Sequence, residues 1–213
     1  MMKKLQITMI HDLVCSWCPI GYYNIKTAAK NVGIDVNFNF IPFELNPGMG
    51  DEGELIADYF SRRFNWSERK LLGYQDSLIK TAATAGVLID FSKRQYYYNT
   101  HKGHLLLHWS EQFGRQVELN EALIKAYFYR GLDISNADVL LDIAVQIGLD
   151  RDLASSALSS VDLERELERK IERQRRLNIE SIPAFTLNNN VFISGSQSVS
   201  FFENALAPYV EKV

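Results

Sequence analysis

The 213-residue sequence predicts an α/β fold in which two parts of one domain are separated by an all-α insertion. Three observations predict it: a strand–helix–strand pattern at the start of the chain, a long helical block without strand periodicity, and a closing helix–strand–strand–helix pattern. Hydrophobic residues make up 46% of the chain, which is enough apolar material for a real core. We expect a first half at residues 1–48, a helical insertion at 49–160 and a second half at 161–213.

The first half combines two strands and a helix. Apolar and polar residues alternate over residues 5–9 and again over 34–40, which is the period of a strand. Between them, residues 20–32 carry apolar side chains at helical spacing, and Gly33 follows as a helix stop. A strand, a crossover helix and a second strand form a βαβ unit, so we expect the two strands to be parallel.

The middle of the chain is predicted to be helical. Helical spacing is found over residues 121–130, 137–147 and 151–158, and the glycines between such segments, Gly114, Gly131 and Gly148, mark breaks. The strand period is absent from about residue 54 to residue 160. We therefore expect an all-α block.

The last part of the chain returns to mixed structure. A helix is predicted over residues 161–177, strands over 184–187 and 191–193, and a closing helix over 199–210 that Ser200 and Glu203 would cap. Three asparagines separate the strands, and asparagine tolerates the positive φ of a tight hairpin. A βαβ half followed by a ββα half is the arrangement of a thioredoxin-like fold, which we predict for this chain.

The chemistry is predicted at Cys15-Ser16-Trp17-Cys18, where the first strand ends and the first helix begins. Unpaired backbone N–H groups and the positive end of the helix dipole favour a thiolate over a thiol at a helix start. Cys18 lies one turn further in, so we expect it to be more buried, with its sulfur in reach of Cys15 for a disulfide. The pair is thus a candidate redox dithiol. Pro19 suits the first helical turn, because its missing N–H has no partner there.

A metal-binding or accidental CxxC is the alternative interpretation. Two cysteines are too few for a structural zinc site unless histidines complete it. His101, His104 and His108 fall on approximately one helix face, but packing or solvent exposure is the simpler interpretation of these imidazoles. We expect no metal.

Pro183 is the second candidate feature, because it directly precedes the third predicted strand. A thioredoxin-like fold holds a cis proline at this point, facing the CxxC pair. A cis bond would expose the backbone of Ile182 for pairing with an extended substrate. The alternative is an ordinary trans proline that opens an edge strand.

Glu44 follows the second parallel strand, whose C-terminal end lies on the same sheet edge as Cys15. A carboxylate at this edge would be placed to relay protons for Cys18. A surface or hydrogen-bonded glutamate is the plainer interpretation. Asp12 calls for the same choice between a chemical and a structural role.

Several motifs resemble those of the DsbA-like thiol-disulfide oxidoreductases of the FrnE type, which have a thioredoxin fold with a helical insertion. The motifs are residues 12–21 (DLVCSWCPIG), 42–47 (PFELNP), Asn99 with His104, 126–128 (AYF), Gly131 with 133–134 (DI), 148–150 (GLD) and 182–185 (IPAF). The resemblance implies that Cys15 attacks, that Cys18 resolves and that Pro183 is the cis proline.

Two positions depart from that pattern. The family commonly has proline where this chain has Ser16, and glycine-valine where it has Ser181-Ile182. We expect Ser16 and Trp17, with Ile182 and Pro183 opposite them, to bind substrate and tune thiolate stability. The direction of electron flow therefore does not carry over from the resemblance.

Kappa glutathione transferases and 2-hydroxychromene-2-carboxylate isomerases are similar in architecture, and they use a serine where Cys15 stands. Both cysteines favour dithiol chemistry, with a glutathione-dependent enzyme as the alternative and a polypeptide-binding holdase as a second one. We expect protein or small-molecule thiols and disulfides as partners. The redox-active disulfide would need no bound cofactor, with glutathione as a candidate co-substrate.

Charge and hydropathy narrow the partners and the compartment. The formal net charge of -3 gives no global field to attract nucleic acid or an anionic membrane. No apolar stretch is long enough for a membrane span, and the N-terminal segment is too short and polar for a secretory leader. We therefore expect a cytoplasmic protein, either a monomer or a homodimer.

Overall fold

The computed structural model describes residues 4–176 and 179–210. Its strands are β1 (Leu5–His11), β2 (Val36–Pro42), β3 (Glu54–Leu55), β4 (Tyr96–Tyr97), β5 (Ala184–Leu187) and β6 (Val191–Ser194). Its α-helices are α1 (Trp17–Asn31), α2 (Ile56–Phe64), α3 (Glu68–Thr84), α4 (His101–Trp109), α5 (Gln116–Ile124), α6 (Ala137–Gln146), α7 (Arg151–Leu158), α8 (Val161–Arg175) and α9 (Val199–Leu206). Short 3₁₀ or π-helical segments are η1 (Ser110–Phe113), η2 (Lys125–Tyr129) and η3 (Ala207–Tyr209).

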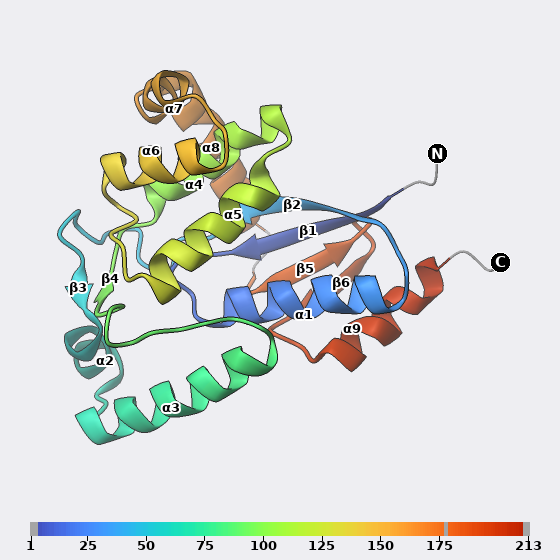
Figure 1. The fold of residues 1–213 in the computed structure, drawn as a ribbon, viewed down its shortest axis with the longest axis horizontal. Helices are drawn as coiled ribbons and strands as arrows, with labels where there is room; N and C mark the ends of the chain where they lie inside the picture. Colours follow the sequence, from blue (N-terminus) through green and yellow to red (C-terminus); the bar gives the residue numbers. More distant parts are fainter. Residues whose placement is uncertain (1–3, 177–178, 211–213) are drawn as a thin grey trace.

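The central sheet has the strand order β2-β1-β5-β6 (Figure 1). β1 and β2 are parallel, with a register that runs from Leu5 opposite Val36 to His11 opposite Pro42. β5 is antiparallel to both β1 and β6. The predicted parallel pair and hairpin are therefore confirmed, and the sheet has the predicted thioredoxin-like topology.

The strand alternation places one buried face of the sheet against α1 and α9. In β1, Ile7 and Met9 are almost fully buried, while Gln6, which points to the other face of the sheet, is exposed. Tyr22 of α1 packs edge-on against Phe38 of β2, with ring centroids 5.1 Å apart. These apolar contacts fix α1, and with it the turn that precedes α1, against the carboxyl end of β1.

The insertion between β2 and α8 is helical but not all-α. Glu54–Leu55 and Tyr96–Tyr97 form an antiparallel two-stranded sheet, so the prediction of an all-α block is wrong at these four positions. A strand of two residues is too short to show alternation, which explains the error. Figure 1 shows α2, α3 and this small sheet at the end of the central sheet where α1 begins, with α4 to α7 above them.

The predicted bounds of helices and strands agree best with the structure where the local sequence pattern is strong. The bounds of α7 and β5 are those predicted, and Asn188 and Asn189 have positive φ of 47° and 59° at the hairpin. The predicted cap of α9 is wrong, because the hydroxyl of Ser198, and not Ser200, accepts the Phe201 N–H.

Two further comparisons concern the ends of elements. The helix predicted over 161–177 ends at Arg175, and residues 1–3 of the basic N-terminal segment, like residue 177, lie outside the described residues. Within 4–176 and 179–210, the chain forms no helix with the length and hydropathy that crossing a membrane requires.

Candidate active site

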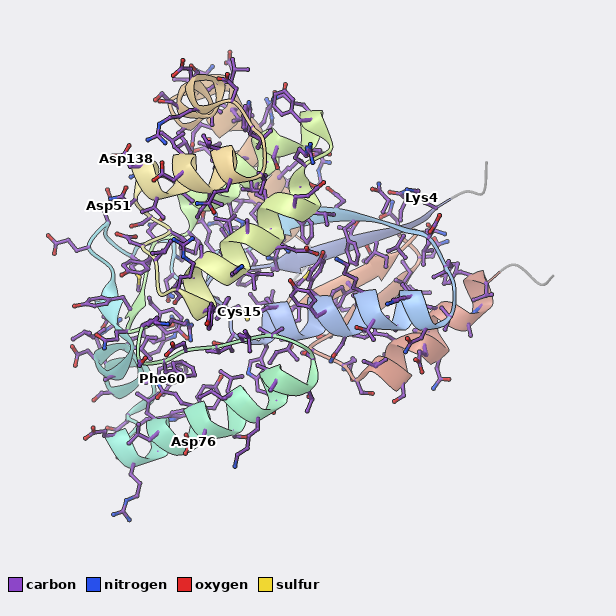
Figure 2. The ribbon with its side chains drawn as sticks, viewed as in Figure 1. Lys4, Cys15, Asp51, Phe60, Asp76 and Asp138 are labelled. Carbon is purple, nitrogen blue, oxygen red and sulfur yellow. The ribbon has the colours of Figure 1, made fainter. Side chains whose placement is uncertain are left out.

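Cys15 lies in the turn between β1 and α1, at the predicted strand-to-helix junction. Figure 2 shows it where α1 begins. Its N–H donates to the carbonyl of Asp12 at 3.2 Å, and its own carbonyl accepts the N–H of Cys18 at 3.1 Å. Ser16 occupies the N-cap position of α1, but its side chain makes no capping hydrogen bond. The backbone therefore holds both cysteines at the start of the helix.

Both cysteines are free thiols, and both are buried. Cys15 is 7% exposed and Cys18 is 2% exposed, in the order that the sequence predicts. Burial raises the pKa of Cys18 well above its usual value, and the neighbouring Cys15 side chain raises it further. Cys18 is therefore held as a thiol at neutral pH.

Pro183 packs against α1 one turn beyond Cys18. The Ile182–Pro183 peptide bond is cis. A Cβ atom added to Gly21 would lie 2.9 Å from Cγ of Pro183, so the proline ring contacts the helix backbone there. The Pro183 carbonyl accepts the N–H of Gly195 at 2.7 Å, which ties this segment to the end of β6.

The insertion supplies the other side of the site. The indole of Trp17 is 39% exposed and lies beside Tyr74 of α3. Burial raises the pKa of Tyr74 and of Tyr97, and the charge of Cys15 also contributes to the rise in both. The two tyrosines therefore lie within electrostatic range of the Cys15 sulfur.

Arg94 is a buried cation that supports the turn before Cys15. It is 2% exposed, and its Nη2 donates to the carbonyl of Val14 at 3.0 Å. Its guanidinium lies 4.7 Å from the ring centroid of Tyr127 and 4.8 Å from that of Phe128. No carboxylate forms an ion pair with it in the described part of the chain, so the aromatic faces stabilise the charge. The sequence carries no signal for this role, because a lone arginine usually indicates a surface position.

Glu44 forms a hydrogen-bonded ion pair with a histidine. Its Oε1 lies 2.6 Å from Nδ1 of His101, whose Nε2 lies 2.6 Å from Glu164 of α8. The hydrogen bond with Glu44 raises the pKa of His101 to about 9, against the opposing effect of burial. Burial opposes ionisation of Glu44, but His101 lowers its pKa overall. Glu44 thus has the geometry of a hydrogen-bonded, structural glutamate, and its described contacts do not include Cys18.

The other two histidines of the predicted helix face also pair separately. Nε2 of His104 lies 3.4 Å from the buried carboxylate of Asp12, and Nε2 of His108 lies 3.3 Å from Glu166. Among residues 4–176 and 179–210, no three histidine, cysteine or acidic side chains are grouped as a metal site would require. A cleft of about 730 Å³ between α4, α7 and α8 is lined by neither cysteine.

A thioredoxin-like fold that carries a CxxC dithiol at the start of its first helix defines the class of this protein. Residues 6–207 match the family described as DSBA-like thioredoxin domain, so the chain belongs to the DsbA-like oxidoreductase family. The resemblance found in the sequence is therefore confirmed at the level of the DsbA-like family.

Individual relatives are distant. The chain is 26% identical over 211 residues to YwbO of Bacillus subtilis (strain 168), an uncharacterized protein, with 98% of each chain covered. It is similar in structure to a probable DsbA oxidoreductase from Streptomyces coelicolor, with a TM-score of 0.87 and 22% identity over 98% of this chain and 92% of that one. A 2-hydroxychromene-2-carboxylate isomerase has a TM-score of 0.68 and 15% identity over 96% and 95% of the two chains. Likenesses at these identities to solved structures show the fold alone.

Proposed function

We propose that this protein is a dithiol-disulfide oxidoreductase of the FrnE type, with Cys15 as the attacking and Cys18 as the resolving cysteine. The observation that carries the proposal is the pair of adjacent, buried free thiols at the start of α1. Unpaired N–H groups at a helix start favour a thiolate there. The more deeply buried Cys18 stays protonated, so it does not compete for the substrate.

The reaction divides into two exchanges. The Cys15 thiolate attacks one sulfur of a substrate disulfide and forms a mixed disulfide with it. The substrate S–S bond breaks, and the other substrate sulfur leaves as a thiolate. The sulfur of Cys18 then loses its proton and attacks Cys15 in the mixed disulfide. The second substrate thiolate leaves, and a Cys15–Cys18 disulfide remains. The same steps in reverse oxidise a substrate dithiol.

Substrate contacts are proposed around Trp17 and the segment Ile182–Pro183. The exposed indole of Trp17 offers an apolar surface next to Cys15, and we propose that the backbone of Ile182 pairs with an extended polypeptide. Leu72 and Ile79 of α3 are 53% and 38% exposed, and their seven-residue spacing puts them on one helix face. These apolar side chains favour protein substrates beside small thiols.

A glutathione-dependent transferase or isomerase is the second candidate function, because this chain shares its fold with the isomerase described above. The presence of both cysteines argues for dithiol exchange, with glutathione as a co-substrate. The exposed apolar side chains of α3 would also suit a holdase.

The test is a redox titration of the whole protein. It is equilibrated across a series of ratios of reduced to oxidised glutathione, the free thiols are alkylated, and the states of both cysteines are determined by mass spectrometry. One cooperative two-electron transition is expected, and its midpoint gives the reduction potential. If an intramolecular disulfide forms at no ratio, the proposal is wrong, and saturable glutathione binding would then support the transferase alternative.

A control separates the holdase function. The double variant Cys15→Ser/Cys18→Ser keeps Leu72 and Ile79, so it retains any chaperone activity and loses all exchange. The holdase function would be favoured by two results together: this variant suppresses the aggregation of an unfolded client protein, and the native protein shows no thiol-disulfide exchange.

A further inference from the structure

A small cavity lies directly behind Cys18. It is lined by Cys18 of α1, by His11 and Asp12 at the end of β1, and by Asn120 of α5, among others. Its volume is about 10 Å³, which is close to the least that holds one water molecule. A water in this position would have the resolving cysteine on one side and two buried polar side chains on the other.

His11 and Asn120 are two of the polar residues that line the cavity. They are 3% and 1% exposed. Nε2 of His11 and both amide atoms of Asn120 have no hydrogen-bond partner among the described residues. Buried polar atoms are nearly always paired, with protein or with ordered water. One water that bonds His11 and Asn120 satisfies groups on both.

The imidazole of His11 is unprotonated at neutral pH and can therefore accept a proton. Burial lowers its pKa well below the ordinary value, and the neighbouring His104, whose ring centroid is 5.5 Å away, adds to the effect. His11 is therefore neutral at neutral pH, with one ring nitrogen free of a proton. It lies at the end of β1, where its carbonyl accepts the Phe43 N–H, and its ring packs edge-on against the rings of Phe40 and His104.

The other ionisable groups at this end of β1 already form hydrogen bonds with protein partners. Asp12 accepts the Leu45 N–H at 2.7 Å through Oδ2, and its Oδ1 faces His104. The hydroxyl of Tyr22, whose side chain also lines the cavity, donates to Glu121. Cys15, the remaining ionisable neighbour of Cys18, is the partner in the disulfide.

On the basis of the dithiol function proposed above, we propose that His11 is the proton acceptor for Cys18, through one water that Asn120 holds in the cavity. In the resolving step, the thiol proton of Cys18 passes to the water and a proton of the water passes to Nε2 of His11. The electron pair left on the Cys18 sulfur forms the bond to Cys15, and the substrate thiolate leaves with the pair of the broken S–S bond.

The imidazolium that forms then returns its proton to solvent. In the reverse direction, His11 gives a proton back to Cys18 as the Cys15–Cys18 bond is broken. The substrate disulfide or dithiol is the only redox partner that these steps use. The function of His11 is thus to make a thiolate from a thiol that burial keeps protonated.

The experiment uses dithiobis(nitrobenzoate), a disulfide that releases a coloured thiol in each exchange. The first equivalent released reports the attack of Cys15, and the second reports resolution by Cys18. In His11→Gln, the amide keeps a polar group in the cavity but accepts no proton at neutral pH. We expect its second phase to be slower by about a hundredfold at about pH 7, with the first phase unchanged. The deficit should shrink as pH rises, because hydroxide replaces the missing base.

Two further variants make the test specific. His108→Gln changes a half-buried histidine that contacts Glu166 and Lys170 and is predicted to leave both phases unchanged. Asn120→Leu removes the group that holds the water while keeping the side-chain volume, and we expect it to slow the second phase several-fold. This variant tests the proposal if His11→Gln does not fold.

The unmodified protein provides a measurement that needs no variant. Its second phase should have a rate that is level across neutral pH, as expected when an internal base is present. A second phase that rises in proportion to hydroxide in the native protein would overturn the role of His11. So would a His11→Gln variant with the native second phase, or one with both phases slowed equally. A native protein that releases only one equivalent would instead overturn the dithiol function itself.

Discussion

Pro183 lies so close to Gly21 that helix α1 has no room for a side chain at that position. A Cβ atom on Gly21 would lie 2.9 Å from Cγ of Pro183 and 3.2 Å from Cζ of Phe185. Both neighbours are ring atoms within a packed core, so neither is free to swing aside. The glycine therefore sets how closely the helix that carries the cysteines approaches the strand that follows Pro183.

Gly21→Ala should lower the free energy of unfolding by about 1–3 kcal/mol, because overpacking forces the helix away from β5. Urea unfolding followed by circular dichroism measures the change. Gly73→Ala is the matched control in exposed helix α3, where an added Cβ meets no atom within 4 Å. It should raise stability by up to about 1 kcal/mol, since alanine is the better helix former. Equal stabilities of the two variants would contradict the close packing.

Cys15→Ser should abolish thiol-disulfide exchange, because it removes the attacking sulfur. Cys18→Ser should instead accumulate a mixed disulfide between Cys15 and the substrate, since nothing remains to resolve it. Mass spectrometry of the acid-quenched protein distinguishes the two. Full exchange activity in Cys15→Ser would show that the assigned order of attack is wrong.

The His101–Glu44 pair should make stability depend on pH. The pKa of His101 is about 9 in the folded protein against an ordinary 6.5, chiefly because Glu44 accepts its hydrogen bond. A raised folded-state pKa contributes stability that is complete below about pH 6.5 and is lost as pH rises through about 9. Since His101 is about one-third exposed, solvent screening limits the contribution to about 1 kcal/mol.

His101→Gln should therefore be destabilised relative to the native protein at about pH 6, and the difference should fade by about pH 10. Urea unfolding at the two pH values measures it. His108 is a suitable comparison, because burial and then Lys170 lower its pKa, so its replacement should cost less at about pH 6 than at about pH 10, which is the opposite dependence. A pH-independent effect of His101→Gln would argue against the ion pair.

Arg94→Ala should destabilise the protein by about 2–5 kcal/mol, because it leaves the Val14 carbonyl without its donor and opens a cavity among aromatic rings. Arg94→Lys should recover little, since an ammonium group lacks the planar shape that stacks on those rings. Arg69→Ala, on the exposed surface of α3, should change stability by no more than about 0.5 kcal/mol. An Arg94→Ala variant as stable as Arg69→Ala would refute the buried role.

Local patterns explain which parts could be predicted. The alternation in β1 and β2 and the CxxC at the following helix start are signals carried by neighbouring residues, so the topology and the dithiol followed from them. Gly131 shows what a local sequence pattern does not predict. Its sequence pattern predicts a helix break, and its φ is indeed +66°, but the close approach of the Lys93 carbonyl is a tertiary requirement.

The residues around the dithiol could not be predicted in the same way. Nothing adjacent to His11 or Asn120 in the sequence indicates that they share a cavity with Cys18, because α5 reaches β1 only through the folded insertion. The two-residue strands β3 and β4 likewise depend on pairing across the insertion, and their own residues show no period. Long-range packing decides such features, and a pattern within a short window does not contain it.

The strand order has a consequence for how the protein is made. β1 is synthesised before the other strands of the central sheet, yet it lies inside that sheet between β2 and β5, and β5 is synthesised much later. A ribosome-bound chain therefore carries Cys15 and Cys18 long before Pro183 and its strand exist to pack against α1. During that interval β1 presents an unpaired edge and the two thiols lack their finished surroundings. The site is therefore assembled only after Pro183 and β5 have been synthesised.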